Sequence, residues 1–197
     1  MIEIVFAGRS NVGKSTLFSQ LFGVKVRRGK RPGTTIKPNQ IKFKDLLVTD
    51  LPGFGYISGV DKEFNERVKD FIVEYIEKNA ERIILAVQVV DGKSFLEIAE
   101  RWERRGYIPV EVEMFEFLNE VCSKVFLAVN KMDKVDNPNE VLDAIALKLG
   151  MTPPWKDWTH VIYPISAKEG KINNLREAIK RRLIEIGRSD LIPVLKK

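Results

Sequence analysis

The chain has 197 residues, of which 44 % are apolar and 30 % charged, with a net charge of +6 and a pI near 9.3. A chain of this length can fold as one domain, and the single Cys122 excludes an intramolecular disulfide and a cysteine-cluster metal site. The longest apolar runs, 83–87 and 125–129, have five residues each, whereas a bilayer span needs ~20. No export signal precedes them, so we expect a cytoplasmic protein of a reducing compartment.

Buried strands alternate with helical patterns along the chain. In order, we expect a strand over 2–7, a helix over 14–22, strands over 40–44 and 46–50, a helix capped by Asp61, a strand over 82–90, a broken helical region over 94–105 and 110–121, a strand over 124–129, a helix over 140–149, a strand over 160–165 and a helix over 173–186. Strands 40–44 and 46–50 must be antiparallel because one residue cannot form a parallel crossover. We therefore predict an α/β fold of the P-loop NTPase type: a six-stranded, mostly parallel sheet with one antiparallel strand and helices on both faces.

The segment GRSNVGKS, from Gly8 to Ser15, fits the pattern G-x-x-x-x-G-K-[ST] between an expected strand and an expected helix. In such a loop, backbone N–H groups and the positive end of the helix converge on phosphate oxygens. Lys14 would reach the terminal phosphates, and the Ser15 hydroxyl would bind Mg²⁺. The pattern indicates a nucleotide site but specifies neither the base nor the reaction.

Two further segments complete the expected phosphate and metal site. Asp50 ends the third strand, at the sheet edge where α/β proteins bind ligands, and we expect it to hold the Mg²⁺ shell through water. The amide of Gly53 could sense a γ-phosphate. Between the loops lies a threonine pair after Gly33: Thr35 is our choice for the Mg²⁺ and γ-phosphate ligand, and Thr34 is the alternative.

The base-selecting segment follows the apolar strand 125–129. The carboxylate of Asp133 can accept hydrogen bonds from N1–H and the 2-amino group of guanine, donors that adenine lacks. Asn130 would bridge the base and the phosphate loop, and the stem of Lys131 would cover the base plane. Backbone N–H groups of residues 166–168, after the sixth strand, would meet guanine O6. This segment therefore predicts specificity for guanine over adenine.

Together the motifs GRSNVGKS, RPGTT, DLPGFGY, NKMD and SAK resemble those of translation-factor-related GTPases, and most of all those of the EngB (YihA) family. The resemblance runs from residue 2 to about residue 186. It implies Mg²⁺-dependent GTP binding and hydrolysis, a role in assembly of the large ribosomal subunit, and a link to cell division and septation. On this basis residues 1–190 would be a single EngB-type G domain and residues 191–197 a basic C-terminal tail.

The sequence leaves undecided which group orients the water that attacks the γ-phosphate. Phe54 follows Gly53 where many signalling GTPases carry a water-orienting glutamine, so we expect its ring to point away from the phosphate and intrinsic turnover to be slow. Backbone groups near Thr35 and Gly53, or a partner, would then hold the water. By resemblance, Asn11 matches a feature associated with K⁺ near the phosphates; a loop-stabilising role is the alternative. Arg9 could supply charge to the phosphates or merely tune affinity.

Basic residues gather in two stretches. Residues 24–44 hold eight lysines and arginines and no acid, and from residue 168 onward nine basic residues face four acidic ones. Such patches suit phosphate contacts with ribosomal RNA, although a solvated loop and tail would look the same. We expect a monomer that binds the large ribosomal subunit and no membrane. The alternatives are a GTP-regulated binding module with incidental hydrolysis and a GTPase serving another RNA-linked process.

The sequence thus predicts one composite site. Its catalytic residues would be Lys14, Thr35 and Gly53, and its Mg²⁺ ligands would be Ser15, Thr35 and Asp50. The residues expected to bind GTP or GDP are Gly8, Arg9, Ser10, Asn11, Val12, Gly13, Lys14, Ser15, Thr16, Gly33, Thr34, Thr35, Asp50, Gly53, Asn130, Lys131, Asp133, Ser166, Ala167 and Lys168.

Overall fold

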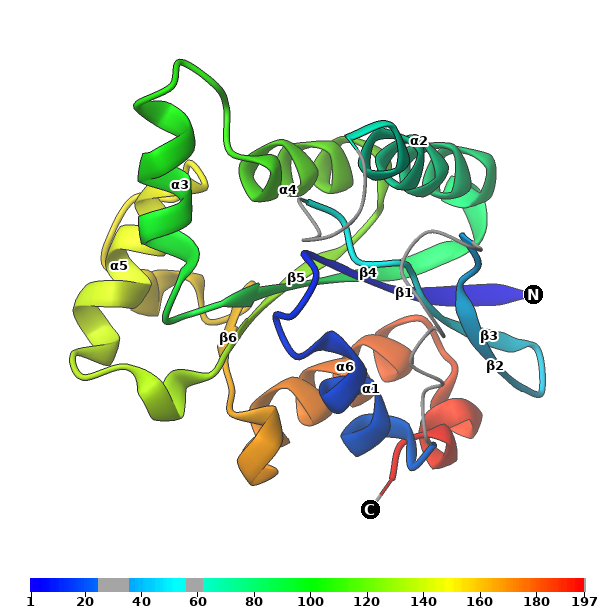
Figure 1. Ribbon diagram of the computed structural model, residues 1–197. Coiled ribbons are helices and arrows are strands. Elements are labelled where there is room, and N and C mark those ends of the chain that lie inside the picture. Colours follow the sequence, from blue (N-terminus) through cyan, green and yellow to red (C-terminus); the bar gives the residue numbers. More distant parts are fainter. Residues whose placement is uncertain (25–35, 56–61, 197) are drawn as a thin grey trace.

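One six-stranded sheet organises the chain (Figure 1), and the computed structural model describes residues 1–24, 36–55 and 62–196 of it. The strands are β1 (Ile2–Gly8), β2 (Asn39–Phe43), β3 (Leu46–Asp50), β4 (Ile83–Asp91), β5 (Val125–Asn130) and β6 (Ile162–Pro164). They lie in the order β2-β3-β1-β4-β5-β6. Only the β2–β3 pair among them is antiparallel. The predicted fold class is confirmed.

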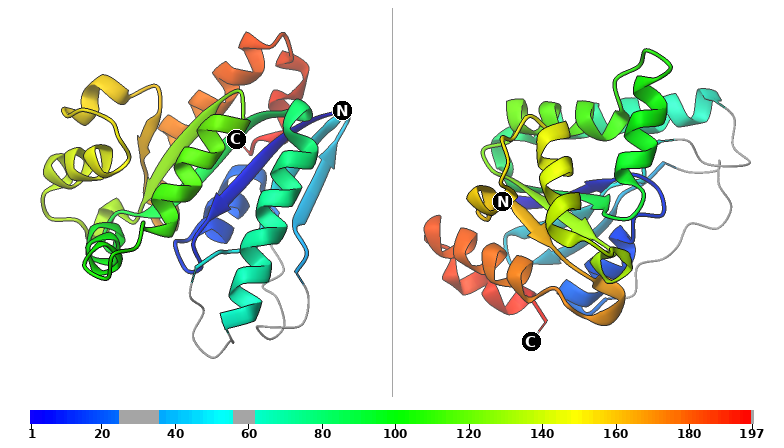
Figure 2. Two further views of the ribbon diagram at one scale, coloured as in Figure 1. Left: turned by 90° about the horizontal axis from the view of Figure 1, so that it is seen from above. Right: turned by 90° about the vertical axis from the view of Figure 1, so that its left-hand side faces the viewer.

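Helices cover both faces of the sheet. They are α1 (Lys14–Phe22), α2 (Lys62–Asn79), α3 (Phe95–Glu103), α4 (Val110–Val121), α5 (Pro138–Lys148) and α6 (Asn173–Glu185). Figures 1 and 2 show α2, α3 and α4 on one side of the sheet and α1 and α6 on the other. Because successive strand residues point to opposite faces, β1 sends Val5 into the core under α2–α5 and Ile4 into the core under α1 and α6.

The observed bounds follow the expected ones within two residues, and the start of the sixth strand is among the largest shifts. We expected this strand to begin at His160, but it begins at Ile162. The preceding residues form a short 3₁₀ helix, Trp155–Trp158, and the backbone N–H of Val161 donates to Trp158 O over 2.8 Å. His160 lies in this turn and stacks on Trp158, with ring centroids 6.0 Å apart. A local turn therefore outcompeted the strand. The expected helix cap, Asp61, lies outside the described residues.

The chain after α6 returns to the core. Residues Ser189–Val194 form a 3₁₀ helix, and Leu191, Val194 and Leu195 are buried in the cluster that contains α1. The backbone N–H of Lys196 donates to Leu21 O in α1 over 2.7 Å. The segment expected to be a basic tail is thus part of the packed fold up to residue 196, because its apolar side chains cover α1.

The parallel arrangement places the loops after β1, β3, β4, β5 and β6 at one edge of the sheet. In parallel strands all carboxyl ends point the same way. These are the loops in which the sequence placed its phosphate, metal and base motifs.

Candidate nucleotide-binding site

The phosphate loop joins β1 to α1 with an unusual backbone. Gly13 lies immediately before α1 with φ 90°, and Asn11 also has a positive φ of 68°. Glycine and asparagine are the residues that adopt such angles at least cost. A Cβ on Gly13 would lie 2.3 Å from Nδ2 of Asn130. This loop is therefore shaped for close approach and touches the base-selecting segment directly.

The loop after β3 packs on the phosphate loop. The N–H of Ser10 donates to Phe54 O over 2.9 Å, and the N–H of Phe54 donates to Gly8 O over 3.2 Å. A Cβ on Gly53 would lie 2.7 Å from Oγ of Ser10, so a side chain there would separate the two loops. The ring of Phe54 is fully buried in the core under α2. We expected the ring to point away from the phosphate; the structure packs it in this core, and its orientation relative to a bound phosphate stays a prediction.

Lys14 and Asp50 form a buried ion pair at the centre of the site. The Lys14 ammonium donates to a carboxylate oxygen of Asp50 and, over 2.6 Å, to the carbonyl oxygen of Leu51. Lys14 is 7 % and Asp50 3 % exposed. Neither charge is isolated in the low-dielectric interior, because each has the other as its counter-ion. Ser15 follows Lys14 in the first turn of α1.

Asn130 connects three segments. Its Nδ2 donates to Val12 O over 2.9 Å, and its Oδ1 accepts the N–H of Ala167 over 2.9 Å. The side chain is 3 % exposed. One buried amide thus fixes the segment after β5 against the phosphate loop on one side and the loop after β6 on the other, as we expected for the phosphate-loop side.

The residues after Asn130 form the rest of the base-selecting segment. Lys131 has φ 64°, and its ammonium donates to Asn11 O over 2.8 Å and to Asp91 Oδ2 over 2.5 Å. Asp133 accepts from the hydroxyl of Ser166 over 2.9 Å, and its own N–H donates to that hydroxyl oxygen over 3.0 Å. The carboxylate of Asp133 is therefore held in a fixed direction.

The loop after β6 contributes fewer free N–H groups than we expected. The N–H of Ser166 donates to Lys171 O over 3.0 Å, and that of Ala167 donates to Asn130. Ser166 instead acts through its hydroxyl, by orienting Asp133. The N–H of Ala167 can donate to a base oxygen only if its hydrogen bond to Asn130 Oδ1 breaks or becomes bifurcated.

A cavity of about 150 Å³ opens between these segments. It is lined by Gly13, Thr16, Asn130, Lys131, Asp133, Lys134 and Lys168. All but Lys134 were predicted to bind nucleotide. Thr16 and Lys168 are thereby placed beside the base-selecting carboxylate.

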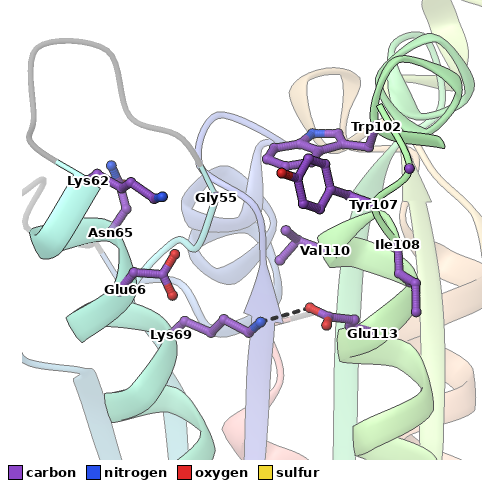
Figure 3. A pocket seen from close by; sticks show the side chains of 11 residues that line it. Gly55, Lys62, Asn65, Glu66, Lys69, Trp102, Tyr107, Ile108, Val110 and Glu113 are labelled. Atoms are coloured by element: carbon purple, nitrogen blue, oxygen red, sulfur yellow. Dashed lines mark hydrogen bonds and ion pairs between the residues drawn. The ribbon is translucent and has the colours of Figure 1, made fainter. Parts of the chain in front are cut away.

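A larger cavity of about 710 Å³ lies elsewhere, between α2 and the α3–α4 region. Figure 3 shows Trp102 and Tyr107 on one wall, Lys62 and Glu66 on the other, and an ion pair at its base. None of the predicted site residues lines it. Volume alone would favour this cavity, but Gly13 of the phosphate loop and Asp133 line the smaller one.

Three predicted ligands, Gly33, Thr34 and Thr35, lie outside the described residues, and their roles stay predictions. Among the residues that the structure describes, no group of three or more His, Cys, Asp or Glu side chains forms a metal cluster. A Mg²⁺ ion here would fit the hard oxygen donors Asp50 and Ser15. Mg²⁺ characteristically combines one or two protein oxygens with phosphate and water ligands.

Sequence reasoning missed two acidic residues beside the site. Asp91, at the end of β4, contacts Lys131; the rule that strand ends carry ligands could have singled it out. Glu111, in the first turn of α4, lies 3.8 Å from the guanidinium of Arg9 and is 3 % exposed. Burial raises the pKa of Glu111, and Arg9 opposes the shift. The sequence has three glutamates within residues 111–116, and their spacing gave no sign that only one of them would be buried.

A phosphate loop, an aspartate at the end of β3 and an N-K-x-D segment converge at one sheet edge, which is the arrangement of a P-loop GTPase. Residues 3–131 match a protein family described as 50S ribosome-binding GTPase. No helix in the described ranges combines the length and apolarity that a membrane span requires.

Sequence relatives narrow the class. The chain is 61 % identical over 188 residues to a probable GTP-binding protein EngB of Archaeoglobus fulgidus, covering 95 % of each chain. It is 50 % identical over 186 residues to one of Pyrococcus horikoshii, covering 94 % of this chain and 84 % of the relative. A crystal structure of a probable GTP-binding protein engB superposes with a TM-score of 0.84 at 49 % identity, covering 93 % of this chain and 99 % of that one. This chain belongs to the EngB family of GTP-binding proteins.

Proposed function

We propose that this protein is a Mg²⁺-dependent GTPase switch that acts in assembly of the large ribosomal subunit. The observation that carries the guanine part is the placement of Asp133, held by Ser166, in one cavity with Gly13 of the phosphate loop and Thr16 of α1. The ribosomal part is supported by the description of the matching family as 50S ribosome-binding and by the net charge of +6.

Each part of the site would act on a different part of GTP. The N–H groups of residues 8–15 would hold the phosphates, and Lys14 would leave Asp50 to contact the terminal ones. Asp50, freed from Lys14, and Ser15 would hold Mg²⁺ together with Thr35. Bound Mg²⁺ would neutralise charge on the phosphate oxygens. The amide of Gly53 would contact the γ-phosphate, which is present in GTP and absent from GDP.

Guanine selectivity is tested by calorimetry with Mg²⁺-GTP and Mg²⁺-ATP. ATP would leave Asp133 without a donor, so we expect its binding to be at least about 1000-fold weaker. Asp133→Asn replaces an acceptor by a donor opposite the base and should weaken GTP binding by about 100-fold or more while improving binding of XTP, whose 2-oxo group accepts. Asp136→Asn, an exposed carboxylate three residues away, is the control and should change neither. Equal affinities for GTP and ATP would overturn the proposal.

The ribosomal role is tested by sedimentation of the protein with large-subunit particles. With a non-hydrolysable GTP analogue we expect co-sedimentation that weakens as salt is raised, and with GDP substantially less. Binding that is the same with both nucleotides would contradict a switch. A cytoplasmic, monomeric protein with a link to cell division and septation is part of the same proposal.

The alternative is a GTP-regulated binding module with incidental hydrolysis. The buried Phe54 favours it, because a phenyl ring has no hydrogen-bonding group that could orient the attacking water. Single-turnover rates with and without large-subunit particles separate the two: acceleration by particles supports the switch. Comparing turnover in K⁺ and Na⁺ buffers tests whether Asn11 helps to bind a cation. The alternative is that Asn11 only stabilises the loop, and its positive φ agrees with that role equally well.

A further inference from the structure

Asp91 occupies a position from which it can act on the base-selecting segment. It is the last residue of β4 and pairs in register with Asn130, the last residue of β5. Its side chain is only 12 % exposed. The neighbouring Gly92 continues the contact, since its N–H donates to Asn130 O over 2.8 Å.

The two carboxylate oxygens of Asp91 have different partners. Oδ1 accepts the backbone N–H of Lys93 over 2.9 Å and that of Ser94 over 3.3 Å, which fixes the turn into α3. Oδ2 accepts from the Lys131 ammonium over 2.5 Å. One oxygen therefore anchors Asp91 to its own loop, and the other holds the lysine of the next strand end. An anchored carboxylate is a better counter-ion than a mobile one because less side-chain entropy is lost.

Lys131 is fixed at both ends by this arrangement. Its backbone is in the left-handed region at φ 64°, and its ammonium is held between Asp91 and the carbonyl oxygen of Asn11. The four-carbon stem must then span from the base-selecting segment to the phosphate loop. A lysine held in this way does not have to be ordered when a base comes to lie against its stem, and preorganisation of this kind increases affinity.

We propose that Asp91 is a positioning residue for the nucleotide: by holding the Lys131 ammonium, it keeps the lysine stem in place as a platform for the base. The inference rests on the proposed site, in which guanine lies against Lys131. Since a platform contacts the face of a base and Asp133 contacts its edge, loss of Asp91 should weaken binding of different purine nucleotides by the same factor.

The test is Asp91→Asn, which keeps an oxygen for Lys93 and Ser94 but removes the charge that holds Lys131. We expect the dissociation constants of GDP and IDP both to rise about tenfold, with their ratio unchanged. Asp91→Glu, which restores the charge, should recover part of the loss. If the dissociation constant rises more for GDP than for IDP, the variant has displaced Asp133, which contacts the 2-amino group that IDP lacks, and Asp91 is merely structural.

Glu103→Gln is the matched control. Glu103 forms a pair with Lys148 over 2.5 Å, and the lysine side chain is 28 % exposed, as is that of Lys131. This variant removes a carboxylate–lysine pair of the same length outside the nucleotide site, so it should leave GDP and IDP binding unchanged. An equal loss in both variants would show a general effect of charge and would overturn the proposal.

A double-mutant cycle identifies the route. Lys131→Met keeps an unbranched apolar stem but has no ammonium for Asp91 to hold. Asp91→Asn should therefore cost much less in the Lys131→Met background than in the wild type. Equal costs in both backgrounds would show that Asp91 acts elsewhere. If the wild type fails to prefer GDP over ADP, the proposed guanine site itself is wrong, a result distinct from any of these.

Discussion

At the scale of single residues, Gly13 shows how backbone conformation and long-range contact can demand the same residue. Its φ of 90° favours glycine, and the space where a Cβ would lie is filled by the amide of Asn130. That amide in turn bonds Val12 and Ala167. Substitution at this one position therefore disturbs the phosphate loop and the base-selecting segment together.

Gly13→Ala should reduce GTP affinity by about 10- to 100-fold, because the methyl group displaces Asn130 and its hydrogen bonds. Gly150→Ala is the control: Gly150 has φ 79°, but a Cβ there would meet no heavy atom within 4 Å. It shares the backbone strain, about 1 kcal/mol, without the contact, so it should lower stability and leave binding unchanged. Calorimetry with GTP and urea unfolding measure the two effects. Equal losses of affinity would contradict this account.

Cys122 offers a second prediction at this scale. It follows α4 and is buried, which raises the pKa of its thiol from 9.0 to about 11. At pH 8 the thiolate fraction is then about 100-fold lower than that of a free thiol. A thiolate-specific disulfide reagent should label the native protein at least about 100-fold more slowly than the urea-unfolded protein. Similar rates would show that Cys122 is accessible in the native state.

At the scale of elements, α4 is joined to the phosphate loop through Arg9. The guanidinium pairs with Glu111, and the stem of Arg9 packs against Gly55, where an added Cβ would lie 3.0 Å from Cγ of Arg9. Val110 and Glu113 flank Glu111 in the same helix and line the larger cavity in Figure 3. Arg9 therefore links the phosphate loop to the helix that lines this cavity. Its guanidinium points to α4 in this structure.

Glu111→Gln should raise the free energy of unfolding at pH 7. Burial raises the pKa of Glu111 above its ordinary 4.5, and Arg9 compensates only in part. A carboxyl whose pKa is raised by folding favours the folded state below the unfolded pKa and loses that contribution as pH rises through the folded pKa. The gain of the variant over the wild type should therefore be larger at pH 7 than at pH 4. Urea unfolding at both pH values measures it; destabilisation at pH 7 would show that the pair with Arg9 outweighs burial.

At the scale of the whole molecule, residues near both ends of the chain pack into the fold. Near the N-terminus, the fully buried carboxylate of Glu3 accepts from Tyr75 OH over 2.6 Å and from Arg82 Nε over 2.7 Å, which ties β1 to α2 and to the start of β4. Near the C-terminus, Leu191 packs on the cluster that contains α1. The helix that carries Lys14 and Ser15 is thereby supported from behind by the end of the chain.

Leu191→Ala should lower the free energy of unfolding by about 2–4 kcal/mol, because it removes a fully buried side chain and leaves a cavity behind α1. Ile184→Ala, at an α6 position that is 55 % exposed, is the control and should cost less than about 1 kcal/mol. Urea unfolding followed by circular dichroism measures both. Near-identical costs would mean that Leu191 contributes little to the core.

Much of this fold was predictable because its signals are local. The strand 2–7, the phosphate loop and the helix after it were expected from apolar runs and glycine spacing, and the structure has all three. The strand start at His160 was wrong because a turn closed by Trp158 and Val161 competes with the sheet there. The buried carboxylate of Glu3 was unexpected in an apolar strand, since its partners lie on other elements.

By itself, the sequence determined which chemical groups this protein carries and at which strand ends they lie, because turn geometry and strand periodicity depend on neighbouring residues. Only the tertiary structure decided their partners: Asp91 with Lys131, Glu111 with Arg9, and Leu191 with the cluster around α1. These pairings join residues far apart in the chain. They depend on how strands are ordered and which faces the helices cover, and no local pattern encodes either.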